Sequence, residues 1–193
     1  YEQGFIRLVW GLGTRAVDRV ANDYPRLIAL SHPMLRPSSE AKSIVRYSQR
    51  YVDLIDLKEN EFKTLPVSEV LDSTYHPLRF IAQVERDTYF ETIRSRIPAE
   101  DSSRLVLTFE GLLQRTHFAD LMREMLSLLE NTYHLPVDME FSVQIEHPHA
   151  AKPGLYINVL QCRPLATLFS TDEEDMPAYL PRENIIFQTH FVV

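Results

Sequence analysis

A strict alternation of polar and apolar side chains runs through Asp138-Met139-Glu140-Phe141-Ser142-Val143-Gln144-Ile145. Successive side chains of a β-strand point to opposite faces of a sheet, so this pattern predicts a strand with one buried face. A second strand is predicted at 155–161, after a loop at about 146–154 that contains two prolines and one glycine. Two strands joined by a short loop are most simply an antiparallel pair.

The register of this predicted hairpin brings four polar side chains to one end. Folding the chain about residue 150 puts Glu140 opposite residues 160–161, so Glu140 and Gln161 become neighbours and Arg163 lies just beyond Asp138. Carboxylate and amide oxygens suit Mg²⁺, and the forked guanidinium of arginine matches phosphate oxygens. The hairpin is therefore a candidate metal–triphosphate platform, although an ordinary solvated face is an alternative interpretation of the same residues.

The fold class follows from the other segments of the chain. A long helix is predicted at about 116–133, because its apolar residues recur at helical spacing and Pro136 prevents it from continuing. We expect this apolar stripe to pack into the core. Further strands are predicted at 4–10, 26–32, 51–57, 62–65, 78–88 and 104–109. Because the strands group in hairpins and do not alternate regularly with helices, the sequence predicts an α+β fold with a mostly antiparallel sheet.

Composition limits the classes of function. The chain has 193 residues, of which 45% are hydrophobic and 24% charged, as in ordinary globular domains. Its net charge of −7 argues against general binding to nucleic acid or to an anionic membrane. No apolar run approaches the roughly 18 residues of a membrane-spanning helix, and no signal peptide is visible. With Cys162 as the single cysteine, a reducing cytoplasmic location is expected.

The ends of the chain predict that it is a piece of a longer protein. Position 1 is not Met, and the last residues form an apolar, strand-like run. We expect a nucleotide-binding domain at 1–168. The acidic run at 172–175 and the prolines near it predict a linker at 169–193, which would lead to a further domain.

Two motifs resemble a known family. The strand Asp138-Met139-Glu140-Phe141 and the later run Leu155-Tyr156-Ile157-Asn158-Val159-Leu160-Gln161-Cys162-Arg163-Pro164-Leu165 are similar to the end of the nucleotide-binding domain of the pyruvate phosphate dikinase and phosphoenolpyruvate synthase family. Val9-Trp10-Gly11-Leu12-Gly13 and the later Ala29-Leu30-Ser31-His32-Pro33 resemble that family as well. The resemblance spans about residues 8–165. It implies the C-terminal part of an ATP-grasp fold, with ATP and Mg²⁺ as cofactors.

The resemblance also implies roles for individual residues. Glu140 and Gln161 would hold Mg²⁺ on the nucleotide phosphates, with Asp138 in or beside that shell. Arg163 would contact the phosphates. Gly11 and Gly13 would let the backbone pass close to the nucleotide side of the sheet.

The family transfers phosphate from ATP to a histidine on a separate swivelling domain, and then to an acceptor such as pyruvate. The implied partners are therefore the missing N-terminal half of the ATP-grasp unit and that swivelling domain. No catalytic residue is expected in this chain, because no phospho-acceptor histidine motif is found. The parent protein is expected to be a dikinase-type enzyme.

The chain departs from the family at two positions. Thr14 stands where the family usually has Glu, and Arg19 stands where it tends to have Gly. These departures leave a second hypothesis open, in which the chain is a non-catalytic module that binds a nucleotide or a partner protein. Antibiotic phosphotransfer by the same machinery is a related alternative.

Two histidines in the loop between the strands could share a metal. His147 and His149 point the same way if the segment is extended, but no third ligand of suitable spacing is evident. An exposed loop is therefore the favoured interpretation. For Cys162, a buried structural thiol on the strand face opposite Gln161 and Arg163 is expected.

Overall fold

The computed structural model describes residues 3–17, 20, 22–95 and 97–165, and it has the predicted α+β class. The strands form three two-stranded sheets and one three-stranded sheet, and every strand pairing in the described residues is antiparallel. No helix in this part of the chain is long and apolar enough to cross a membrane. The predicted linker at 169–193 and Arg19 lie outside the described residues.

The first sheet pairs β1 (Phe5–Leu8) with β2 (Arg26–Ala29). Ile6 and Ile28 face each other across the pair and are both buried in the hydrophobic core. The short helix α1 (Thr14–Val17) lies between the two strands in sequence.

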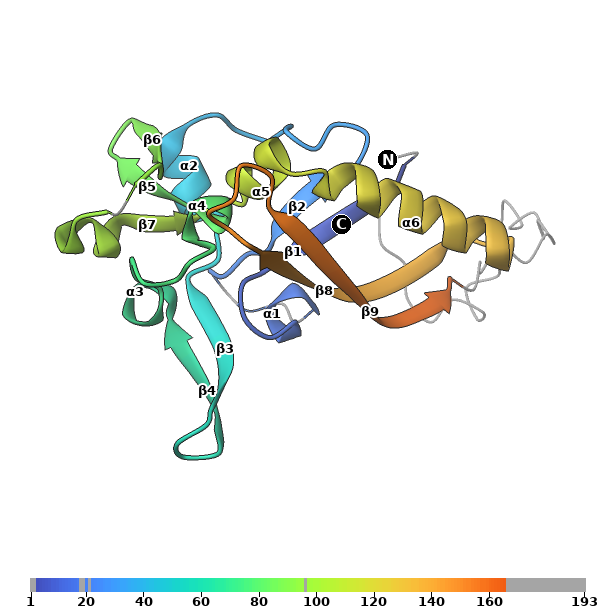
Figure 1. Cartoon of the computed structure of the whole chain (residues 1–193), viewed down its shortest axis with the longest axis horizontal. Helices are drawn as coiled ribbons and strands as arrows, with labels where there is room; N and C mark the ends of the chain where they lie inside the picture. Colours follow the sequence, from blue (N-terminus) through green and yellow to red (C-terminus); the bar gives the residue numbers. More distant parts are fainter. Residues whose placement is uncertain (1–2, 18–19, 21, 96, 166–193) are drawn as a thin grey trace, which may run out of the picture.

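The second sheet is a hairpin that projects from the body of the molecule (Figure 1). It consists of β3 (Tyr51–Asp56) and β4 (Glu61–Pro66), and α2 (Ala41–Arg46) and α3 (Val67–Val70) flank it in the chain. At its base Val52 and Asp53 are buried, whereas side chains toward the tip are exposed. The base therefore joins the core, and it carries a buried carboxylate.

The three-stranded sheet has β5 (Ala82–Arg86) between β6 (Tyr89–Thr92) and β7 (Leu105–Leu107). The prediction of a strand at 78–88 is wrong at its start, because Leu78–Ile81 form the helix α4 with three buried apolar side chains. Sequence alternation could not separate this helical turn from the strand that follows it. The 3-10 helix η1 (Ala99–Arg104) precedes β7, and α5 (Glu110–Arg115) follows it.

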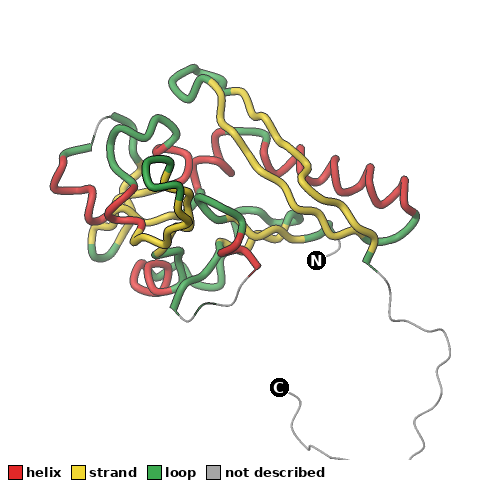
Figure 2. The backbone as a smooth tube through the Cα atoms, turned by 90° about the horizontal axis from the view of Figure 1, so that it is seen from below, coloured by secondary structure: helices red, strands yellow, loops and turns green. Residues whose placement is uncertain are grey.

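The predicted long helix is α6 (Phe118–Tyr133), and it runs beside the hairpin of β8 (Val137–Glu146) and β9 (Gly154–Pro164), as Figure 2 shows. Phe118 packs on Phe141 of β8, with their ring centroids 6.3 Å apart. The apolar stripe is buried at Phe118 and Met122, whereas Tyr133 at the far end is 44% exposed. The helix therefore covers the apolar inner face of the hairpin most tightly at its N-terminal end.

The register of β8 and β9 agrees with the prediction because of a β-bulge. Ser142 pairs with Asn158. Glu140, the next residue of β8 on the same exposed face, pairs with Gln161 and not with Leu160. The extra residue, Leu160, lies in the bulge and is 66% exposed. Because one inserted residue reverses the face of every side chain after it, the bulge turns Gln161 and the residues beyond it to the face of Glu140.

Candidate functional site

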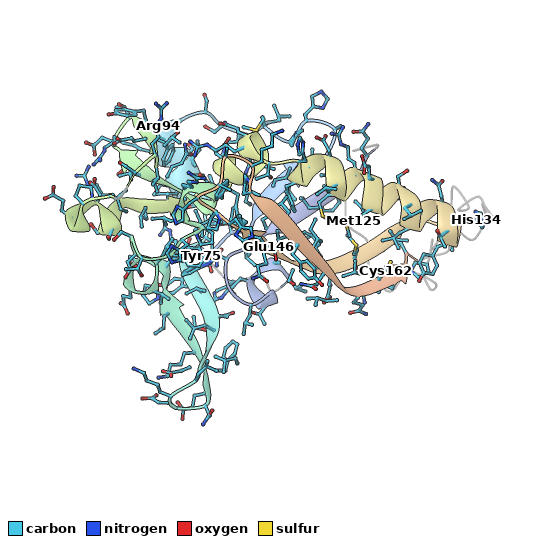
Figure 3. All side chains as sticks on the ribbon, viewed as in Figure 1. Tyr75, Arg94, Met125, His134, Glu146 and Cys162 are labelled. Carbon is cyan, nitrogen blue, oxygen red and sulfur yellow. The ribbon has the colours of Figure 1, made fainter. Side chains whose placement is uncertain are left out.

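Four predicted site residues lie together on the outer face of the β8–β9 hairpin, near its open end. Asp138 pairs with Arg163 and Glu140 pairs with Gln161. The inner face carries Met139 and Phe141, which pack against the core. Figure 3 places Cys162 at this end of the hairpin, beyond the Met125 region and beneath the distal part of α6. The polar side chains thus form an open surface whose position is fixed by the packed side behind it.

Asp138 holds Arg163 by an exposed, forked contact. The Nη2 and Nε atoms of Arg163 both donate to Oδ2 of Asp138, at 2.8 and 3.2 Å. The hydrogen bond to Asp138, the charge of Asp138 and the charge of Glu140 raise the pKa of the Arg163 guanidinium. The side chains are 62% and 46% exposed, so Arg163 stays cationic and open to a ligand from solution.

Glu140 and Gln161 are adjacent across the strands and exposed. Directly opposed residues have Cβ atoms about 5 Å apart, so their side-chain oxygens can reach a common ion. Within the described part of the chain, neither side chain has a hydrogen-bond or ion-pair partner. Two unengaged hard oxygen donors fit Mg²⁺, which typically takes only one or two protein ligands beside phosphate oxygens.

In the described residues, the hairpin face carries no three-ligand group of His, Cys, Asp or Glu side chains. An ion that takes most of its ligands from phosphate and water needs only one or two protein oxygens.

Cys162 is half-buried and pairs with Met139, on the face opposite Gln161 and Arg163. The strand itself therefore separates the thiol from the polar face, as the sequence predicts.

The two predicted glycines lie against a different element. Gly11 has a φ of +98°, and a Cβ added there would lie 2.4 Å from Cγ2 of Val52 and 2.8 Å from the carbonyl oxygen of Asp53. The next residue, Leu12, donates its N–H to that same carbonyl oxygen at 3.0 Å. Gly13 has no atom within 4 Å of an added Cβ. Gly11 thus permits close packing on β3, and a contact of either glycine with a nucleotide stays a prediction.

A buried polar network next to these glycines is not evident from the sequence. Asp53 of β3 accepts hydrogen bonds from Thr14 at 2.6 Å, from Thr64 at 2.6 Å and from two nitrogens of Arg15 at 2.9 and 3.1 Å. Arg15 also donates to Asp23 at 3.1 Å. Thr14, the departure from the family pattern, therefore fastens the start of α1 to β3.

The electrostatics of this network favour its charged form. Hydrogen bonds and charge from Asp53, together with Asp23, raise the pKa of Arg15 against the opposing effect of burial. Burial alone would raise the pKa of Asp53, but hydrogen bonds from Arg15, Thr14 and Thr64 lower it below its ordinary value. The network thus anchors the segment of Gly11 and Gly13 to β3, and both carboxylate oxygens of Asp53 accept hydrogen bonds.

The fold and the open polar face define an α+β domain with a candidate phosphate-binding surface. Comparison with known families gives a match to the family described as "Pyruvate phosphate dikinase, AMP/ATP-binding domain", over residues 1–184. Because this match covers most of the 193 residues, the chain belongs to that family of ATP-binding domains, as the two motifs predict. No match was found among curated proteins or among solved structures.

Proposed function

We propose that this chain is the Mg-ATP-holding part of an ATP-grasp unit in a dikinase-type phosphotransferase. The single observation that carries the proposal is the outer face of the β8–β9 hairpin. There the Glu140 carboxylate and the Gln161 amide, both without a hydrogen-bond partner among the described residues, are paired across the strands, with the Arg163 guanidinium one step beyond.

Each side chain of this face has a distinct part in the proposal. Glu140 and Gln161 would hold the metal, which would supply positive charge to neutralise the phosphates. Arg163 binds the phosphates through its fork. Asp138 lies beside that shell and keeps Arg163 oriented until the nucleotide binds. The protein's contribution is thus positioning and charge neutralisation, which is most of what phosphoryl transfer requires.

The proposal assigns the remaining parts of the machinery to other segments of a longer protein. The proposal places domain 1–168 against an N-terminal half of the ATP-grasp unit, and 169–193 becomes the linker to the next domain. A histidine on a swivelling domain then takes the phosphate and passes it to pyruvate or a similar acceptor. This enzyme would act in the cytoplasm.

Calorimetry with the complete natural protein tests the binding surface. With Mg²⁺ present, we expect Arg163→Ala to weaken ATP binding by at least about tenfold, because it removes charge-assisted bonds to phosphate. Gln161→Ala should weaken binding only when Mg²⁺ is present. Gln144 lies on the same exposed face of β8, so Gln144→Ala is the matched control and should bind as the natural protein does. Unchanged affinity in Arg163→Ala would refute the proposed surface.

A second assay separates the enzyme from the alternative of a non-catalytic module. Transfer of the terminal phosphate of ATP to a histidine of the complete protein would support the phosphotransferase. ATP binding without such transfer would favour the module. The departure at Thr14 has a structural role in this fold, since Thr14 donates a hydrogen bond to Asp53.

A further inference from the structure

Three histidines meet at the closed end of the β8–β9 hairpin, opposite to the end with the polar face. An open cavity of about 450 Å³ there is lined by His76, His147, Pro148, His149 and Ala150. His147 and His149 come from the loop after β8, whereas His76 comes from the segment before α4. In Figure 1 this loop reaches back over the region of α4 and α5. The cavity therefore joins two parts of the chain that are distant in sequence.

His76 and His149 contact each other directly. Nδ1 of His76 lies 3.2 Å from Nε2 of His149, and the two rings meet edge-on with their centroids 5.4 Å apart. Arg79, the neighbour of Leu78 in α4, reaches the same loop, since its Nη2 donates to the carbonyl oxygen of Ala150 at 3.4 Å. The loop is thus held to the start of α4 by one imidazole pair and one hydrogen bond.

The separation of the two nitrogens matches that of two ligands on one ion. Imidazole nitrogens lie about 2.0–2.1 Å from zinc, and the tetrahedral angle then sets them roughly 3.3 Å apart. Both rings are exposed, so a small rotation can aim both lone pairs at an ion in the cavity. Imidazole is also the ligand that borderline ions such as Zn²⁺ and Cu²⁺ prefer.

We propose that His76 and His149 bind a divalent transition-metal ion of the zinc type. Water completes its shell, and His147 lines the same cavity. The site has two protein ligands in this geometry, which agrees with the finding that no group of three His, Cys, Asp or Glu side chains in the described residues surrounds a common ion. For this, the ring that donates the present hydrogen bond takes its other neutral tautomer, so that its proton lies on the far nitrogen and both facing nitrogens offer lone pairs. The bound ion then fastens the hairpin loop to the start of α4.

This site is separate from the proposed nucleotide surface in both position and chemistry. Glu140 and Gln161 are hard oxygen donors at the open end, whereas the imidazoles are nitrogen donors at the closed end. Mg²⁺ favours the former and zinc-type ions the latter. Failure of one proposal therefore leaves the other intact.

Titration of the tag-free chain with ZnCl₂, followed by calorimetry, tests the proposal. We expect saturable binding of one ion, weakened at least about tenfold by His76→Ala and equally by His149→Ala, since each removes one of two ligands. His117 is an exposed histidine at the start of α6, so His117→Ala is the matched control and should leave the affinity unchanged.

Circular dichroism checks that each variant folds, and we expect native spectra because both side chains are exposed. A second readout is the visible absorption of Co²⁺, which should report nitrogen ligation in the natural chain and lose it in both variants. The proposal is overturned if ZnCl₂ gives no saturable binding, or if either alanine variant keeps the affinity of the natural chain. In that case the two rings form only a neutral hydrogen bond.

Discussion

Two arginine–aspartate pairs in this domain have the same chemistry and opposite surroundings. Arg15 and Asp53 have side chains only 10% and 7% exposed, and two threonines complete the hydrogen bonds of the carboxylate. Arg163 and Asp138 are 62% and 46% exposed, and the Glu140 and Gln161 side chains beside them have no partners within the described residues. The first pair is closed to solvent and saturated, and the second is open.

The difference separates what holds the fold from what can bind a ligand. Removing one member of a buried pair leaves an uncompensated charge and is strongly destabilising. Exposed pairs contribute little to stability, because water and salt screen them. We therefore infer that the buried pair maintains the glycine segment on β3, whereas the exposed pair is free to exchange its partner for phosphate.

The largest effect on stability is expected from Arg15→Ala. This change leaves the buried carboxylates of Asp53 and Asp23 without their cationic partner. The free energy of unfolding should fall by about 3–5 kcal/mol, measured by urea denaturation. A loss well below that range would mean that solvent reaches the network. The two arginine–aspartate pairs would then not differ in their contribution to stability, against this account.

Gly11→Ala should have the second largest effect. Its free energy of unfolding should fall by about 2–4 kcal/mol, because alanine is strained at a positive φ and the added methyl overpacks the site. The added methyl would collide with Val52 and with the backbone of Asp53. Gly13→Ala is the matched control, because an added Cβ there meets open space. Its unfolding midpoint should be nearly unchanged, and equal losses at the two glycines would contradict the packing described for β3.

The pH dependence of unfolding sharpens the comparison further. The folded-state pKa of Asp53 is lowered, so the folded state binds fewer protons than the unfolded state near the ordinary aspartate pKa. The stabilisation from Asp53 is therefore present above about pH 4 and is lost as the pH falls through its folded pKa. The stability gap between the natural chain and Asp53→Asn should shrink from pH 7 to pH 3. A gap that stays constant would argue against an ionised Asp53.

The smallest effect on stability is expected at the exposed pair. Arg163→Ala should leave the unfolding midpoint essentially unchanged, because the side chain is largely in water. Its effect should appear in ATP affinity alone. Marked destabilisation of this variant would show that the open pair is structural, like the buried one.

The strand pairing was predictable from sequence because its determinants are local. Alternation defines β8, and a short loop forces β9 to pair with it, so Glu140 and Gln161 meet as expected. The bulge at Leu160 was not predictable, although it decides which face Gln161 shares. Its position depends on tertiary packing, since no local residue pattern marks it.

The polar network and the histidine pair were missed for a different reason. Arg15 and Asp53 are 38 positions apart, and His76 and His149 are 73 apart. Hydrophobic periodicity gives the type of an element, but it does not say which elements meet. Short elements such as α2 and α5 were also missed, because six residues are too few to establish a helical period.

The most direct test of the open polar face is the Mg²⁺ dependence of thermal stabilisation by ATP in the complete natural protein. A ligand that binds only the folded state raises the unfolding midpoint as its concentration exceeds its dissociation constant. We expect ATP with Mg²⁺ to give a larger shift than ATP alone in the natural protein and in Gln144→Ala. This extra shift should be absent in Glu140→Gln. A full Mg²⁺-dependent shift in Glu140→Gln would contradict the assignment of the hairpin face to the metal and the nucleotide.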